Sequence, residues 1–159
     1  MDAHKVFMDR AIALAREGVA GGHGGPFGAV IVRDGHIIGE GHNRVLSATD
    51  PTAHAEVTAI RDAARNEHKF DLSGTTIYIN AFPCPMCMSA IFWARIDKIY
   101  YVCTPEDAEQ IGFDDQEFYR QLEKPPAERT TPAIQLPAYL DAARDSFQTW
   151  LDRQDRTPY

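Results

Sequence analysis

The sequence has few of the features that mark disulfide-stabilised proteins. Only three cysteines occur among 159 residues, and so small an odd number argues against a disulfide framework. Two of these cysteines lie three positions apart, a spacing typical of metal binding in a reducing compartment. We therefore expect a cytoplasmic protein whose cysteines stay reduced.

Long apolar runs and an excess of positive charge are also missing. No apolar run approaches the roughly 20 residues that span a bilayer, and the first five residues, MDAHK, are too polar to begin a secretory signal. The 16 Lys and Arg residues are outnumbered by 23 Asp and Glu residues, which gives a net charge of −7 with histidine neutral. An acidic chain gains little from neutralising phosphates, so we expect neither a membrane nor a nucleic acid as a partner.

Length and composition indicate a single α/β domain over residues 1–159. A chain with 44% hydrophobic residues can bury one core. Apolar spacing predicts helices at residues 2–17, 53–67 and 85–93, and strands at residues 27–33, 36–41, 75–80 and 99–103. The glycine-rich residues 18–25 are predicted to form a loop. Residues 137–159 are predicted to form a C-terminal helix and a polar tail.

The order of these elements predicts a mixed central sheet. Asp34-Gly35 lies between the first two predicted strands and is a strong signal for a two-residue hairpin, so these strands should pair antiparallel. The strand, helix and strand of residues 75–103 predict a parallel pair joined by a right-handed crossover.

Two short motifs carry the chemistry. The sequence His-Ala-Glu at residues 54–56 and the sequence Pro-Cys-Pro-Met-Cys at residues 83–87 supply three zinc ligands, His54, Cys84 and Cys87, and one further carboxylate, Glu56. A hydrolytic zinc site keeps three protein ligands and leaves one position for water. The pattern H-x-E…P-C-x-x-C is the signature of zinc-dependent nucleobase deaminases. We therefore expect a zinc-bound hydroxide as nucleophile and Glu56 as the proton shuttle.

The predicted helices place these ligands at helix starts. Cys84 and Cys87, at positions i and i+3, lie on one side of a first helical turn, where unpaired N–H groups favour thiolates. The sequence leaves two alternatives open. One is a structural zinc completed by His42 or Cys103, although Cys103 in its apolar strand is more typical of a small core residue. The other is a zinc-binding interaction module without catalytic activity.

Longer segments resemble a known family. The run PTAHAEVTAIR at residues 51–61, the cysteine motif with the Ala-Ile and Trp-Ala-Arg that follow it, GFDD at residues 112–115 and ERT at residues 128–130 are similar to the small bacterial guanine deaminases of the cytidine deaminase superfamily. The resemblance covers most of the chain. It implies a three-layer α/β/α fold and hydrolysis of guanine to xanthine and ammonia.

The resemblance also implies substrate contacts. Asn43, the backbone at Ala55, and Asp115 match family residues that contact the purine. Family members form dimers in which the carboxy-terminal segment crosses to the partner, which implies a homodimer with a substrate-facing role for Tyr159. The implied partner is a small nucleobase.

One position departs from the pattern. Many superfamily members have Glu immediately before the Pro-Cys-x-x-Cys motif, whereas this sequence has Phe82. The departure leaves other substrates open: a pterin, a triazine or a cytosine-like base. A transfer-RNA adenosine deaminase would use the same zinc chemistry, but the acidic balance of the chain argues against binding an anionic polymer.

Overall fold

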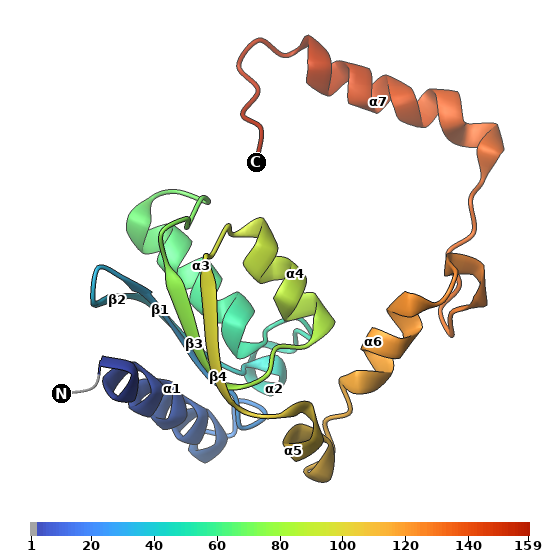
Figure 1. Cartoon of the computed structure of the whole chain (residues 1–159). Helices are drawn as coiled ribbons and strands as arrows, with labels where there is room; N and C mark the ends of the chain where they lie inside the picture. The colour runs from blue at the N-terminus through green and yellow to red at the C-terminus, as the bar shows by residue number, and fades with distance from the viewer. Residues whose placement is uncertain (1–2) are drawn as a thin grey trace. The chain divides into compact units, whose positions relative to one another are not determined.

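The computed structural model describes residues 3–159 (Figure 1). The chain divides into two compact units, Met1–Phe118 and Tyr119–Tyr159. The predicted beginning of the first helix at Asp2 lies outside the described residues. No helix within residues 3–159 is long and apolar enough to cross a membrane.

The first unit is built on a mixed sheet. Within the described residues, four strands lie in the order β2-β1-β3-β4. They are β1 (Gly28–Arg33), β2 (His36–His42), β3 (Thr76–Ala81) and β4 (Lys98–Cys103). β1 pairs antiparallel with β2 and with β3, whereas β3 and β4 are parallel. The predicted mixed sheet is confirmed.

The hairpin between β1 and β2 has the predicted turn. Asp34 and Gly35 both have positive φ, 48° and 77°. Two consecutive positive φ values are those of a type I′ turn, whose twist matches that of the flanking strands.

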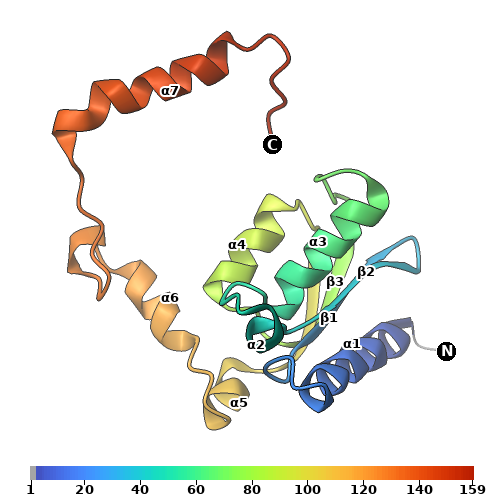
Figure 2. The same ribbon diagram turned by 180° about the vertical axis from the view of Figure 1, so that it is seen from behind.

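Helices cover both faces of the sheet. Figures 1 and 2 show α1 (Ala3–Ala20) on one face and α3 (Ala55–Glu67) with α4 (Pro85–Trp93) on the other. The predicted three-layer α/β/α arrangement is therefore confirmed for this unit. α1 runs three residues past its predicted end, and Gly18 belongs to it. A Cβ atom at Gly18 would lie 2.8 Å from His42 Cδ2, so glycine allows this turn of the helix to approach β2.

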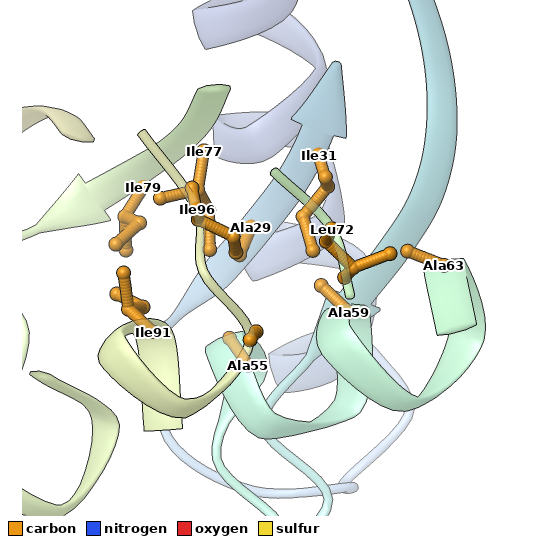
Figure 3. Packing of buried hydrophobic residues seen from close by; sticks show 11 residues of the cluster. Ala29, Ile31, Ala55, Ala59, Ala63, Leu72, Ile77, Ile79, Ile91 and Ile96 are labelled. Carbon is orange, nitrogen blue, oxygen red and sulfur yellow. The ribbon is translucent and has the colours of Figure 1, made fainter. Parts of the chain in front are cut away.

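α3 packs against the sheet through small residues. Ala55, Ala59 and Ala63 recur every fourth residue and are fully buried. Figure 3 shows them facing the isoleucines of the sheet. Their core cluster is completed by Ala29, Ile31, Leu72, Ile77, Ile79, Ile91, Ala94 and Ile96. Because alanine side chains are small, the backbone of α3 can lie near the sheet along this face.

The remaining elements are helical. The first unit also contains α2 (Val45–Ala48) and α5 (Pro105–Gln110), and α6 (Gln116–Glu123) spans the boundary between the units. In the second unit, the short turns Pro126–Glu128 and Pro137–Tyr139 precede α7 (Leu140–Asp152), which occupies the region predicted as the C-terminal helix.

One burial prediction is wrong. Cys103 was expected to be a small core residue, but it is exposed. It ends β4, whose only neighbour among the described strands is β3, so one edge of β4 has no strand beside it. Alternation of apolar residues indicates a strand, but it does not indicate whether another layer covers that strand.

Candidate metal and catalytic site

Two helix starts bring the predicted zinc ligands together. His54 is the N-cap of α3 and Cys84 is the N-cap of α4, both with extended backbone, and Cys87 lies in the first turn of α4. His54 Nδ1 lies 3.6 Å from Cys84 Sγ and 3.5 Å from Cys87 Sγ. Among the described residues, these three are the group whose ligand atoms converge closely enough to hold a metal ion.

The distances fit a tetrahedral zinc site. Zn–S bonds of about 2.3 Å and Zn–N bonds of about 2.0–2.1 Å at tetrahedral angles separate nitrogen from sulfur by roughly 3.6 Å. The observed separations of 3.5 and 3.6 Å therefore need no rearrangement of the ligands. His42, considered as a fourth ligand, instead lies with its Nε2 2.8 Å from His23 Nδ1.

The pKa values of the two cysteines are shifted in opposite directions. Cys87 and His54 stabilise the Cys84 thiolate, which lowers the pKa of Cys84 to about 4. The hydrogen bond with that thiolate, together with burial, raises the pKa of Cys87. The Cys84 thiolate also raises the pKa of His54. Because cysteine binds a metal ion as the thiolate, a cation held at this site would favour deprotonation of Cys87 as well.

Glu56 is a buried carboxyl group with no cationic side chain of Lys or Arg bonded to it in the described structure. Its side chain is 6% exposed in the first turn of α3. Desolvation raises the pKa of Glu56 to about 7, because burial disfavours the charged form. A carboxyl group with this pKa accepts and returns protons near neutral pH, as a general acid–base catalyst must.

A cavity of about 290 Å³ opens beside the ligands. Of the predicted site residues, Asn43, His54, Glu56, Cys84 and Asp115 line it. The rest of the wall consists mainly of small or apolar residues: Gly24, Gly25, Phe27, Val45, Leu46, Pro51, Phe82 and Phe113. A largely apolar cavity with a few polar groups suits a heteroaromatic ring.

Asn43 offers donors to this cavity. It is 4% exposed, and its Oδ1 accepts a hydrogen bond of 3.0 Å from the Val45 N–H. Because that oxygen is occupied, the side-chain amide group is left with its N–H donors for a ligand. Gly24 lies against the same side chain, where a Cβ atom would collide with Asn43 Oδ1.

Asp115 offers an acceptor. It is half-buried, and burial followed by the negative charge of Cys84 raises the pKa of Asp115. The Phe113 ring, two residues earlier, packs edge-on against Phe27 with ring centroids 4.9 Å apart. The loop between α5 and α6 therefore reaches the cavity with both a carboxylate and an aromatic ring.

Some predicted site residues lie outside the cavity wall. Cys87 is fully buried and belongs with His54 and Cys84 to the cluster that could hold a metal ion. Ala55, predicted as a backbone contact, is the first residue of α3 between His54 and Glu56. Tyr159 belongs to the second compact unit.

Sequence reasoning missed most of the apolar wall. Phe27 carries no motif of its own, Phe113 stands in the GFDD segment without a predicted role, and the glycines at positions 24 and 25 were predicted only as part of a loop. The signal that could have found them is the low complexity of the glycine run before a strand, which is typical of backbone that closely approaches a ligand.

A three-ligand His/Cys/Cys cluster with a buried carboxylate beside it, held in an α/β/α fold, defines a zinc-dependent hydrolytic deaminase. The sequence comparisons agree with this class. The model of the cytidine and deoxycytidylate deaminase zinc-binding region matches residues 1–103. The chain belongs to this family.

Individual relatives match over different lengths. The guanine deaminase of Bacillus subtilis (strain 168) is 46% identical over 156 residues, which cover 98% of this chain and 99% of that protein. The X-ray structure of guanine deaminase from Bacillus subtilis superposes with a TM-score of 0.93 at 46% identity and covers 98% of both chains. The tRNA-specific adenosine deaminase of Haemophilus influenzae is 38% identical over 136 residues, 77% of this chain and 78% of that protein.

Proposed function

We propose that this chain catalyses the hydrolytic deamination of guanine to xanthine and ammonia. The observation that carries the proposal is one cavity in which His54, Cys84 and the carboxyl group of Glu56 lie together with the hydrogen-bonding side chains of Asn43 and Asp115. The match to guanine deaminase over 98% of the chain at 46% identity supports guanine as the substrate.

We assign zinc binding to His54, Cys84 and Cys87, whose atoms have the spacing of a tetrahedral site. A zinc ion bound there lowers the pKa of water and so supplies a nucleophile at neutral pH. Two thiolates and a neutral imidazole balance the charge of the ion, which suits a site that must keep one position for water.

Glu56 carries the protons in this proposal. The oxygen of water forms a bond to the ring carbon that bears the amino group, while Glu56 accepts a proton from that water. The carboxyl group then protonates a ring nitrogen. Glu56 next accepts the remaining proton of the added hydroxyl group and passes it to the amino group, so that the added oxygen becomes a carbonyl oxygen of xanthine. The carbon–nitrogen bond breaks and ammonia leaves, because a protonated amine is the better leaving group.

We assign recognition of the base to Asn43 and Asp115, with the backbone at Ala55. Guanine presents N–H donors that the Asp115 carboxylate can accept and acceptors that the Asn43 amide can satisfy. A base that lacks these groups would leave both side chains unpaired in a largely apolar cavity, which is a strong source of discrimination.

We further propose that the active protein is a single-domain homodimer in which residues 137–159 cross to the partner and Tyr159 faces its substrate. The exposed apolar side chains of Phe147, Trp150 and Leu151 in α7 support association with a second copy, because large apolar side chains are normally covered. A pair of cysteines that binds metal and forms no disulfide supports a reducing, cytoplasmic location.

Phe82 favours a second candidate substrate class. Its side chain lines the cavity beside Cys84 and packs edge-on against Tyr101, with ring centroids 5.1 Å apart. An apolar ring at this position suits other flat amino-substituted heterocycles, such as a pterin, a triazine or a cytosine-like base, as side substrates. Nucleic acid is a poorer candidate, because the chain carries a net charge of −7.

A substrate panel tests the proposal. Zinc-loaded protein is assayed for ammonia release from guanine, guanosine, cytosine, adenine, a pterin and a triazine amine. We expect the highest kcat/KM with guanine. If another free heterocycle were turned over in preference to guanine, that compound would be the substrate. If the protein acted only on transfer RNA, and did so in a salt-sensitive way, the substrate would be a nucleic acid and not a free base. Absence of ammonia release from every compound would leave a zinc-binding module without catalytic activity.

A further inference from the structure

We infer that Asn80 is a positioning residue that, through Phe27, fixes where Asn43 and Asp115 lie in the cavity wall. The inference rests on the proposed function, in which those two side chains contact the base. Asn80 does not line the cavity, so its effect on substrate would be exerted through other residues.

The side chain of Asn80 makes hydrogen bonds where the backbone pairing of β1 with β3 ends. The antiparallel pairing of β1 with β3 runs from Val32 opposite Thr76 to Ala29 opposite Ile79. The next residue pair would be Gly28 and Asn80, and there the side chain takes over. Asn80 Oδ1 accepts from the Gly28 N–H at 2.9 Å. Its Nδ2 donates to the Pro26 carbonyl at 2.8 Å.

These two hydrogen bonds are made to the backbone on either side of Phe27. A carboxamide that accepts from residue 28 and donates to residue 26 fixes the backbone on both sides of the residue between them. Both bonds are partly buried, so their loss would leave polar backbone groups without a partner away from water. Phe27 thereby enters the cavity wall with a defined direction.

The backbone of Phe27 is hydrogen-bonded to Asn43, the first of the two proposed substrate contacts. Its carbonyl accepts a hydrogen bond of 3.0 Å from the Asn43 N–H. The loop that carries Asn43 is therefore tied to the same short segment that Asn80 holds.

The ring of Phe27 is connected through Phe113 to Asp115, the second proposed substrate contact. It meets the Phe113 ring edge-on, with centroids 4.9 Å apart and an interplanar angle of 87°. A Cβ atom at Gly25 would lie 2.9 Å from Phe113 Cζ and 3.0 Å from Phe27 Cε2, so the two rings leave no room for a larger residue there. The Phe113 carbonyl accepts from the Asp115 N–H at 3.3 Å, which connects the ring contact to the carboxylate.

The simpler explanation for Asn80 is an ordinary hydrogen bond at a strand end that stabilises the fold. The chain provides a matched control for that explanation. Asn66 Nδ2 also donates to a strand carbonyl, that of Ile38, at 2.9 Å. Asn66 is exposed and does not line the cavity.

The experiment compares Asn80→Ala with Asn66→Ala in the full-length, zinc-loaded protein. For Asn80→Ala we expect KM for guanine to rise about tenfold with kcat changed less than about threefold, because misplaced binding groups weaken ground-state and transition-state binding together. Zinc content should equal that of the wild type, and Asn66→Ala should keep the wild-type KM. Asn80→Ser retains one polar group and serves as the test variant if Asn80→Ala does not fold.

A double-mutant cycle tests the route. Because Asn80 is inferred to reach Asp115 through the contact between Phe27 and Phe113, Asn80→Ala combined with Phe113→Leu should raise KM by less than the product of the two single effects. Effects that multiply independently would overturn this route to Asp115 and leave Asn80 connected only to Asn43, through the Phe27 carbonyl. An unchanged KM in Asn80→Ala, or an equal rise in Asn66→Ala, would overturn the positioning role while leaving the proposed function intact. A wild-type protein that releases no ammonia from guanine would refute the proposed function and this inference with it.

Discussion

Gly41 of β2 lies directly against the backbone of Ala55, the first residue of α3. A Cβ atom at position 41 would be 2.5 Å from the Ala55 carbonyl oxygen and 2.5 Å from the Ala59 nitrogen. These neighbours are backbone atoms, which cannot turn aside as a flexible side chain can. Because His54 and Glu56 flank Ala55, this strand-to-helix contact sets the distance of both groups from the sheet.

Gly41→Ala should therefore damage both the fold and the metal site. The added methyl group must push α3 away from β2, and overpacking of this kind lowers the free energy of unfolding by about 1–3 kcal/mol. Urea denaturation of the zinc-loaded protein measures the loss, and competition with a chelator measures the accompanying fall in zinc affinity. An unchanged denaturation midpoint would show that α3 is free to move.

Glu56→Gln and Cys87→Ala should separate catalysis from metal binding. The Gln side chain cannot carry the protons, so kcat should fall by about 10²–10⁴-fold while bound zinc stays at the wild-type level. Cys87→Ala removes a ligand and should lose zinc as well as activity. Metal analysis and ammonia assays on the same preparations make the comparison. Near-wild-type turnover by the Gln variant would remove Glu56 from the role of proton carrier.

Arg10 and Glu40 form an ion pair between α1 and β2 that predicts a pH-dependent stability. Arg10 Nε and Nη2 donate to the two oxygens of Glu40 at 2.8 and 2.7 Å. The arginine lowers the pKa of Glu40. Since the folded-state pKa lies below the unfolded one, the stabilisation is complete above the unfolded pKa and is lost as pH falls through the folded pKa.

We therefore expect Glu40→Gln to lower the free energy of unfolding at pH 7 by about 1 kcal/mol or less, because both side chains are partly exposed. The difference from the wild type should shrink as the pH falls below about 4. Asp9→Asn is the matched control, since the pair of Lys5 and Asp9 within α1 is more exposed, at 67% and 60%. A difference that persists unchanged into acid would show that the charge of Glu40 is not responsible.

Deletion of the last residues through Tyr159 tests the proposed crossing tail. If Tyr159 faces the substrate of the partner, guanine turnover should fall sharply while bound zinc and thermal stability stay near the wild-type values. The measurements are kcat, KM and zinc content of the truncated protein, with sedimentation to determine its oligomeric state. Unchanged kinetics would take Tyr159 out of the site.

The convergence of His54, Cys84 and Cys87 could be expected from the sequence because much of its geometry is local. Cys84 and Cys87 share a single helical turn, and His54 and Glu56 are separated by only one residue at another helix start. Helical periodicity places Cys84 and Cys87 on one side of α4, and the single residue between His54 and Glu56 keeps both at the start of α3. The structure adds that both N-caps, His54 and Cys84, face the same point, which the spacing implied but did not establish.

The apolar wall and its supports could not be predicted in this way. Phe27 meets Phe113 across 86 residues of chain, and Asn80 reaches Pro26 across 54. Neither contact follows from a local period or motif. Cys103 shows the same limit, because its exposure depends on whether another layer covers the edge of β4.

By itself, the sequence determined which side chains can carry the proposed chemistry, His54, Cys84, Cys87 and Glu56, and the alternation of strands and helices around them, since each motif and each element depends on residues close together in the chain. Only the tertiary structure decided the depth of α3 on β2, the walls of the cavity and the support of Asn43 and Asp115. Those features depend on contacts between distant segments, whose distances are set when the core packs.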